Sequence, residues 1–290
     1  MHTQNDALYQ QQKQIAYPTI ILAVVAAAGY LVAAIAGAQE KLSLGWVVLI
    51  NSIATYLLFT PMHEASHYNI TGQRPAWRWL NESIGWLSGI TLLAPLPLFR
   101  VLHFRHHAHT NHPEKDPDHW VAAQSLVSLL THTTTIFPVY VYRAWQLLRS
   151  DQKLPRQTRR DLRVSFIALS VFVAVLIALG SWLSWPVILT IWILPAAIAQ
   201  GFLALTFDWL PHHPHRERAR FRHTRIIDVP GLSFLLLGQN YHLIHHLYPN
   251  LPFYKYKAVY QDMQDDLEQE GTEIISLSSD MHTHPDSSYD

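Results

Sequence analysis

Four long apolar segments constrain the fold of this chain more than any other feature of its sequence. Each offers about 20 mainly apolar residues, the length that a helix needs to cross roughly 30 Å of hydrocarbon. The segments run from Pro18 to Ala38, Leu44 to Met62, Val164 to Leu183 and Trp185 to Phe207. The sequence therefore predicts an all-α, multi-pass integral membrane protein.

The composition agrees with a membrane protein. Charged residues make up 14% of the chain, whereas about 25% is usual in a soluble domain. The formal net charge is zero, which gives no reason to expect nucleic acid as a partner. Two weaker apolar stretches, Ile84 to Phe99 and Val121 to Tyr142, are broken by prolines and polar residues. We expect these two stretches to lie in the membrane interface or to be re-entrant, with a further span by one of them as the alternative.

Short links join the four spans into two hairpins. Residues Gln39 to Ser43 connect the first pair and Ser184 connects the second, and short connections imply antiparallel neighbours. All longer polar regions then fall on one side of the membrane. Lys41 is the only basic residue in either link, so the positive-inside rule places the polar side and both termini in the cytoplasm.

The same pattern divides the chain into three parts. Residues 1–17 lack the pattern of a signal peptide and are expected to form a cytosolic segment. Residues 18–270 form the predicted catalytic membrane domain. Residues 271–290 are polar, without apolar periodicity, and are expected to be disordered.

Nineteen histidines and no cysteine restrict any metal site to nitrogen and oxygen ligands. Three histidine boxes stand beside the predicted spans, and their spacings place the imidazoles of each box on one helical face. The boxes are His63 and His67, then His103, His106 and His107, then His242, His245 and His246. All three fall on the predicted cytoplasmic side.

The number of these histidines favours two metal ions. A single site uses three or four protein ligands, while the boxes supply eight histidines and His212, after the fourth span, makes nine. Asp208 could contribute through a bound water. Asp116 and Asp118 could orient a ligand histidine, or could simply belong to a proline turn.

The order H-x-x-x-H, H-x-x-H-H, H-x-x-H-H around two membrane hairpins resembles the membrane fatty acid desaturase superfamily, from Pro18 to about Tyr260. This superfamily includes acyl desaturases, lipid hydroxylases and carotenoid ring hydroxylases. The resemblance implies four membrane helices with a cytosolic helical cap, and a di-iron centre whose ligands are the nine histidines named above. Some members carry Asn where this chain has Asp208, which leaves the role of Asp208 open.

Two short stretches, F-D-W-L-P-H-H-P-H and G-Q-N-Y-H-L-I-H-H-L-Y-P, look similar to the β-carotene ring hydroxylases. The favoured hypothesis is therefore hydroxylation of a carotenoid β-ring, with fatty acyl desaturation as the alternative. In either reaction two ferrous ions and O2 would attack an unactivated C–H bond, and the placement of the substrate would decide the product. A remote alternative is an H-E-x-x-H zinc protease with Glu64 as base, but that hypothesis leaves both H-x-x-H-H boxes unexplained.

Each turnover would need two external electrons. The chain has no cysteine and no G-x-G-x-x-G dinucleotide fingerprint. We therefore expect a separate donor such as ferredoxin, besides a lipid or carotenoid substrate from the membrane. The arginine-rich stretch from Arg216 to Arg225 could dock an acidic partner, or could reflect positive-inside bias and contact with anionic lipid.

Overall fold

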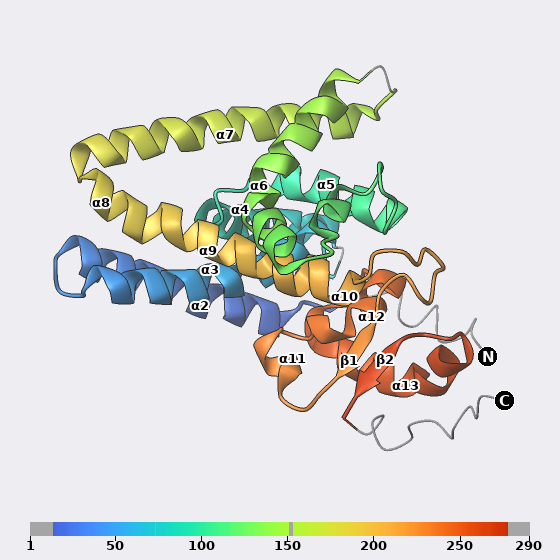
Figure 1. Ribbon diagram of the computed structural model, residues 1–290. Coiled ribbons are helices and arrows are strands. Elements are labelled where there is room, and N and C mark those ends of the chain that lie inside the picture. The colour runs from blue at the N-terminus through green and yellow to red at the C-terminus, as the bar shows by residue number, and fades with distance from the viewer. Residues whose placement is uncertain (1–13, 73, 151–152, 278–290) are drawn as a thin grey trace.

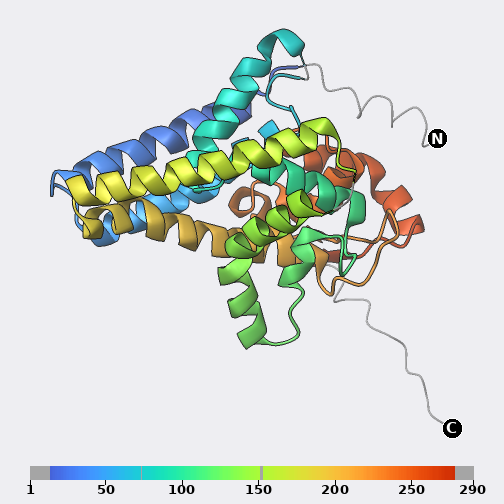
Figure 2. The same cartoon turned by 90° about the horizontal axis from the view of Figure 1, so that it is seen from above.

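The computed structural model describes residues 14–72, 74–150 and 153–277, and four long helical rods dominate this part of the chain (Figures 1 and 2). The rods are α2 (Tyr17–Ala38), α3 (Leu44–Ser66), α7 (Arg156–Trp182) and the run from α8 to α10 (Trp185–His212). Each is long and apolar enough to cross a membrane. The four predicted spans are therefore confirmed, although α3, α7 and the α8 to α10 run extend beyond the predicted ends.

The first hairpin packs through small side chains. On α2 the buried positions include Ala23, Ala26, Ala33 and Gly37, and α3 is its main packing partner. The larger apolar side chains of α2 point outward; Val32 is 67% exposed. Small residues between helices and large apolar residues outside are the arrangement expected of helices in lipid.

The second hairpin is irregular where the first is regular. Its second rod consists of α8 (Trp185–Ile188), the π-helix η3 (Leu189–Ile193), α9 (Leu194–Leu203), the π-helix η4 (Ala204–Trp209) and α10 (Leu210–His212). Pro195 cannot donate a hydrogen bond to the carbonyl of Ile191, one turn earlier. Tyr30 and Asn51 donate to this carbonyl instead, at 2.9 Å and 2.8 Å. The first hairpin thus satisfies a backbone group that would be costly to leave unpaired in lipid.

Two segments, one of them sharply bent, lie between the hairpins. After η1 (Pro75–Trp77), helices α4 (Arg78–Thr91) and α5 (Leu96–His109) meet at 97°. The stretch from Ile84 to Phe99 is thus broken, as the sequence predicted. Residues Pro117–Val121 form η2, and α6 (Leu126–Arg149) begins with a capping box in which Ser125 and Ser128 bond each other's backbone.

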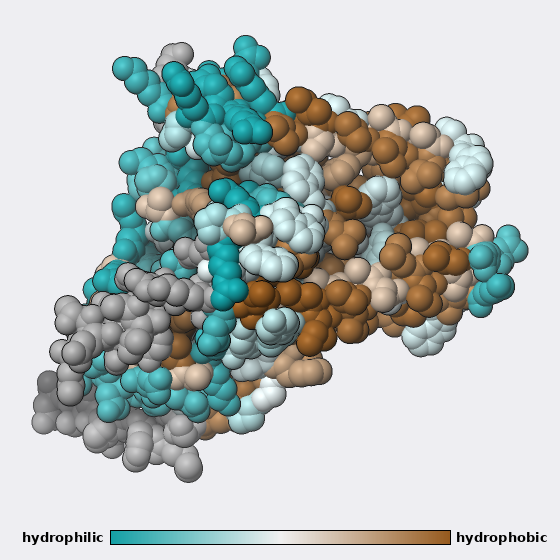
Figure 3. All heavy atoms as spheres, turned by 180° about the vertical axis from the view of Figure 1, so that it is seen from behind, coloured by the Kyte–Doolittle hydropathy of each residue, from teal (hydrophilic) through white to brown (hydrophobic). Residues whose placement is uncertain are grey.

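A small cap follows the last rod. Its elements are β1 (Ile226–Asp228), α11 (Leu232–Leu235), η5 (Gln239–Tyr241), α12 (His242–Leu247), η6 (Phe253–Lys255), α13 (Tyr256–Gln269) and β2 (Ile274–Ser276). Buried residues such as Tyr241, Leu243, Tyr256 and Leu267 form its core. The predicted helical cap is present. Viewed from behind, the surface is hydrophilic at the cap end and apolar along the rods (Figure 3).

The cap differs from the sequence-based expectation in one respect. An all-α fold with disorder from residue 271 was expected, yet β1 and β2 form a parallel pair that joins Ile226 to Ile274 and Ile227 to Ile275. The strand β2 forms because Ile274 packs against the cap core. A strand of three residues is too short to show an apolar periodicity in the sequence, so it was not predicted. Residues 278–290, like 1–13, lie outside the described part of the chain.

Two glycines of α2 provide a test of the hairpin. A side chain at Gly37 would meet the Val47 side chain at 2.5 Å, whereas one at Gly29 would meet nothing within 4 Å. We expect Gly37→Leu to lower the free energy of unfolding in detergent by about 1–3 kcal/mol through overpacking. Gly29→Leu, the matched control, should leave it unchanged or raise it. Equal effects of the two substitutions would contradict this packing.

Candidate metal centre

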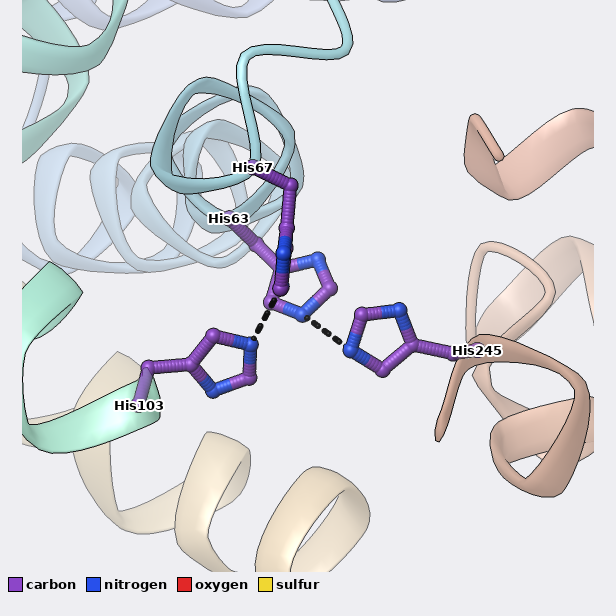
Figure 4. Close-up of side chains that lie close together, drawn as sticks. All are labelled: His63, His67, His103 and His245. Atoms are coloured by element: carbon purple, nitrogen blue, oxygen red, sulfur yellow. Dashed lines mark hydrogen bonds between the residues drawn. The ribbon is translucent and has the colours of Figure 1, made fainter. Parts of the chain in front are cut away.

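The first group of histidines joins three helices that are distant in sequence. His63 and His67 lie at the end of α3, His103 and His107 on α5, and His245 on α12. The Nε2 atoms of His63 and His245 are 3.1 Å apart, and those of His67 and His103 are 2.8 Å apart (Figure 4). The Nε2 atom of His107 lies 3.1 Å from that of His103 and 2.8 Å from that of His245. Five imidazoles therefore converge on one point.

The second group lies beside the first. It contains His106 from α5, His212 from α10, and His242 and His246 from α12, with ligand atoms within 4.8 Å of one another. The Nε2 atom of His246 is 3.2 Å from that of His106 and 3.1 Å from that of His242. All nine histidines predicted as ligands are thus brought together, five in one group and four in the other.

The nitrogen contacts have the geometry of a coordination shell. Metal–imidazole bonds of about 2.1 Å place neighbouring nitrogens of an octahedral ion about 3 Å apart. The Nε2 atom of His245 lies close to two other Nε2 atoms, a crowding of lone pairs that a cation would relieve. Both ring nitrogens of His212 are buried without a hydrogen-bond partner among the described residues. Buried polar atoms of this kind are costly unless they bind something.

Hydrogen bonds on the opposite ring nitrogens fix the imidazoles in place. The Nδ1 atom of His242 lies 3.0 Å from Oε1 of Gln239, and that of His245 lies 3.0 Å from the hydroxyl of Tyr256. Since an amide oxygen accepts, a proton on the Nδ1 atom of His242 satisfies this contact. The Nε2 lone pair is then free for a metal, as in most metal-binding histidines.

Asp116 and Asp118 both reach His106. Their carboxylates lie 2.9 Å and 3.2 Å from its Nδ1 atom. Asp116 also accepts hydrogen bonds from the backbone of Asn111 and of Asp118, and the hydroxyl of Tyr140 donates to Asp118 at 2.5 Å. These carboxylates thus orient a histidine, although Asp116 also stabilises the turn as its N-cap.

Asp208 occupies a different place. It lies on η4 and lines a cavity together with His63, His103, His106 and His242. Within the described residues it belongs to neither histidine group. This position leaves room for the water-mediated role considered from the sequence, which stays a prediction.

Burial keeps the histidines of α12 uncharged. It lowers the pKa of His242, His245 and His246 well below the ordinary value, and nearby imidazoles lower each pKa further. The neutral imidazole is the form that binds a metal ion.

Several residues of the centre carried little or no signal in the sequence. Gln239 precedes His242 by one helical turn, a spacing that could have suggested their contact. Tyr140 and Tyr256 reach the centre only because α6 and α13 pack against it. His223, whose ring lies 5.0 Å from that of His246, belongs to no spaced motif. His109 and His112 lie in neither histidine group.

Glu64 does not occupy the place of a protease base. Its carboxylate is buried and accepts a hydrogen bond from the backbone N–H of Phe253, at 3.2 Å. A base in a zinc protease must instead face the metal-bound water. Glu64 therefore ties α3 to the cap, which argues against the protease alternative.

Comparison with known proteins finds similarity to enzymes named for fatty acid chemistry. A family model described as fatty acid desaturase matches residues 41–278. An sn-1 oleoyl-lipid 12-desaturase from Anabaena variabilis is 24% identical over 89% of this chain and 78% of its own length. A fatty acid conjugase from Calendula officinalis is 23% identical over 66% of this chain and 60% of its own length. A chloroplastic omega-3 fatty acid desaturase from Glycine max is 23% identical over 69% of this chain and 49% of its own length.

The chain thus spans about half to three fifths of the length of these plant relatives. All three proteins are named for fatty acid chemistry. The similarity to β-carotene ring hydroxylases, expected from two short stretches, gains no support from these matches, and the acyl alternative fits them better.

Removal of one ligand of the first group should lower the metal content of the centre. His245 contacts two other histidines of the first group, so we expect His245→Ala to lose about half or more of the metal bound by the chain after loading with ferrous iron. Metal content by inductively coupled plasma mass spectrometry measures this loss. His109→Ala, which changes a histidine outside both groups, should keep the metal content of the unsubstituted chain, and an equal loss would contradict the assignment.

Acid should destabilise the metal-free protein. Because burial lowers the pKa of the α12 histidines in the folded state, the unfolded state binds more protons as the pH falls below about 6.5, the ordinary histidine pKa. The free energy of unfolding should therefore be highest above this pH and decline below it, as measured by denaturant titration at several pH values. His245→Asn should show a shallower decline. A stability that rises on acidification would refute this prediction.

Proposed function

This chain belongs to the fatty acid desaturase family, and we propose that it is a membrane di-iron oxidoreductase that introduces a double bond into a fatty acyl chain. The nine histidines of the two groups would hold two iron ions. When bound, the metal pair supplies the activation of O2 and the removal of hydrogen from an unactivated C–H bond. The histidine-bearing face would be cytoplasmic, as the distribution of arginine and lysine predicts.

One observation carries the proposal: an apolar cavity leads to the histidines. The cavity is lined mainly by apolar side chains of α3, α5, α6 and α9. Four of its lining residues also line the cavity that contains His63 and His103. The four shared residues are Phe59, Phe99, Tyr140 and Asp208. A substrate from the membrane could therefore place its methylene groups beside the centre without entering water.

Aromatic side chains form the junction of the two cavities. The ring of Phe59 packs edge-on against the rings of Phe99 and Phe207, with centroid distances of 5.2 Å and 4.7 Å. The ring of Phe99 stacks on that of His103, with the centroids 5.0 Å apart. These packed rings restrict how a chain can lie beside the histidines, and such positioning decides which hydrogens are removed. A flexible acyl chain suits such a passage better than the bulky ring end of a carotenoid.

The histidine partners would hold the ligands ready for the metal ions. Gln239 keeps a proton on the Nδ1 atom of His242, and Asp116 does the same for His106. The electrons would come from a separate carrier, because the chain has no cysteine for an iron–sulfur cluster and no dinucleotide fingerprint.

Product analysis tests the proposal. We would express the chain in cells that make β-carotene and compare fatty acids and pigments by gas and liquid chromatography with mass spectrometry. A new unsaturated fatty acid should be produced, and the His245→Ala variant should not produce it. Hydroxylated carotenoids together with unchanged fatty acids would instead support the ring-hydroxylase hypothesis and contradict the proposed acyl desaturation.

A further inference from the structure

A second, polar cleft reaches the metal centre. It is lined by His107, Ala108, His109, Thr110, Arg218, Arg220, His223 and His246. None of these residues lines the apolar cavity or its junction with the histidines. His107 belongs to the first histidine group and His246 to the second. The cleft therefore exposes one imidazole of each group to a polar surface.

The wall of the cleft that carries the arginines is held in place. Asn111 donates hydrogen bonds to the backbone carbonyls of Glu217 and His223, both at 2.7 Å. His223 is buried, with its Nδ1 atom 3.0 Å from the carbonyl of Ala219 and its ring 5.0 Å from that of His246. The exposed segment around Ala219 is thus fixed against the end of α5.

The charge at the mouth of the cleft is available to a partner. Arg218 and Arg220 are exposed, and no carboxylate of the described residues lies within ion-pair distance of either. The neighbouring Glu217 instead faces Arg222, at 3.9 Å. Two guanidinium groups without a carboxylate partner among the described residues therefore flank a passage that ends at the metal centre, and that of Arg220 lies over the ring of Phe221.

We propose that the mouth of this cleft docks an acidic one-electron carrier protein, with Arg218 and Arg220 pairing with its carboxylates. This inference rests on the proposed function. Desaturation of –CH2–CH2– to –CH=CH– releases two electrons and two protons, while reduction of O2 to two waters takes four of each. The two missing electrons come from two carrier molecules, each oxidised by one electron, and the two missing protons come from water. Entry beside His107 and His246 keeps the carrier out of the apolar cavity.

A binding measurement tests the docking surface without requiring turnover. The full chain, in nanodiscs of neutral phosphatidylcholine, would be titrated with a plant-type ferredoxin as the acidic probe. We expect Arg218→Glu with Arg220→Glu to raise the Kd by about tenfold or more at low salt, because attraction at the mouth becomes repulsion. The difference should shrink as salt screens the charges.

The matched control carries the same change of charge elsewhere. Arg156 and Arg160 are exposed at the start of α7, and Arg156→Glu with Arg160→Glu should change the Kd by less than about twofold. Equal weakening by both pairs would show a general charge effect and overturn the docking surface. No binding of ferredoxin by the unsubstituted chain would also overturn it, while the proposed desaturation would still be judged by its products.

Chemical reduction separates docking from damage to the centre. With dithionite in place of ferredoxin, the Arg218→Glu, Arg220→Glu chain should form product at the rate of the unsubstituted chain. An equal loss with both reductants would mean that the arginines support the metal site, and would refute the docking role. The binding of phosphatidylglycerol by the two double variants should also be compared. If the Arg218→Glu, Arg220→Glu chain differs from its control in binding this lipid but not in binding ferredoxin, the arginines bind lipid and the proposal is wrong.

Discussion

The convergence of nine imidazoles on two points is the constraint on which the rest of this structure depends. Imidazole nitrogens that crowd within about 3 Å of each other, buried and partly without hydrogen-bond partners, would destabilise a fold that held nothing between them. The ends of α3, α5 and α10 must therefore meet at one level, and α12 must close over them. The membrane rods set that level, since α3 and the α8 to α10 run both deliver a histidine at the same end.

The two approaches to the centre differ in chemistry because they are built from different parts of the fold. Phe59, Leu98 and Ile136 come from α3, α5 and α6, and they make an apolar approach. Arg218, Arg220 and His109 come from the loop after α10 and from the end of α5, and they make a polar one. A lipid chain and a water-soluble protein could therefore reach the same metals without competing for space.

The sequence predicted what is encoded locally and missed what depends on packing. Apolar length predicted the four spans, and the i, i+3, i+4 spacing predicted that the imidazoles of each box share one helical face. The spacing did not predict that each triplet divides between the two groups, with His106 apart from His103 and His107, and His245 apart from His242 and His246. The contact of Tyr256 with His245 and the strand at Ile274 depend on how α13 folds back across the cap, and neither leaves a periodic pattern. The histidine boxes also describe the metal site and not the substrate. The cavity residues are scattered over four helices and form no sequence motif. The substrate was therefore inferred from two short stretches around the histidines, which favoured a carotenoid, whereas the relatives favour an acyl chain.

The helix α12 has a consequence for the biosynthesis of this protein. Its six residues supply His245 to one histidine group and His242 and His246 to the other, and the contact between His63 and His245 spans 182 residues of chain. Neither shell can be complete until translation has passed residue 246, when all four rods have already been made. Metal insertion must therefore be a late step of assembly. Until the cap folds, the nascent membrane domain must hold the histidines of α3, α5 and α10 without a metal ion between them.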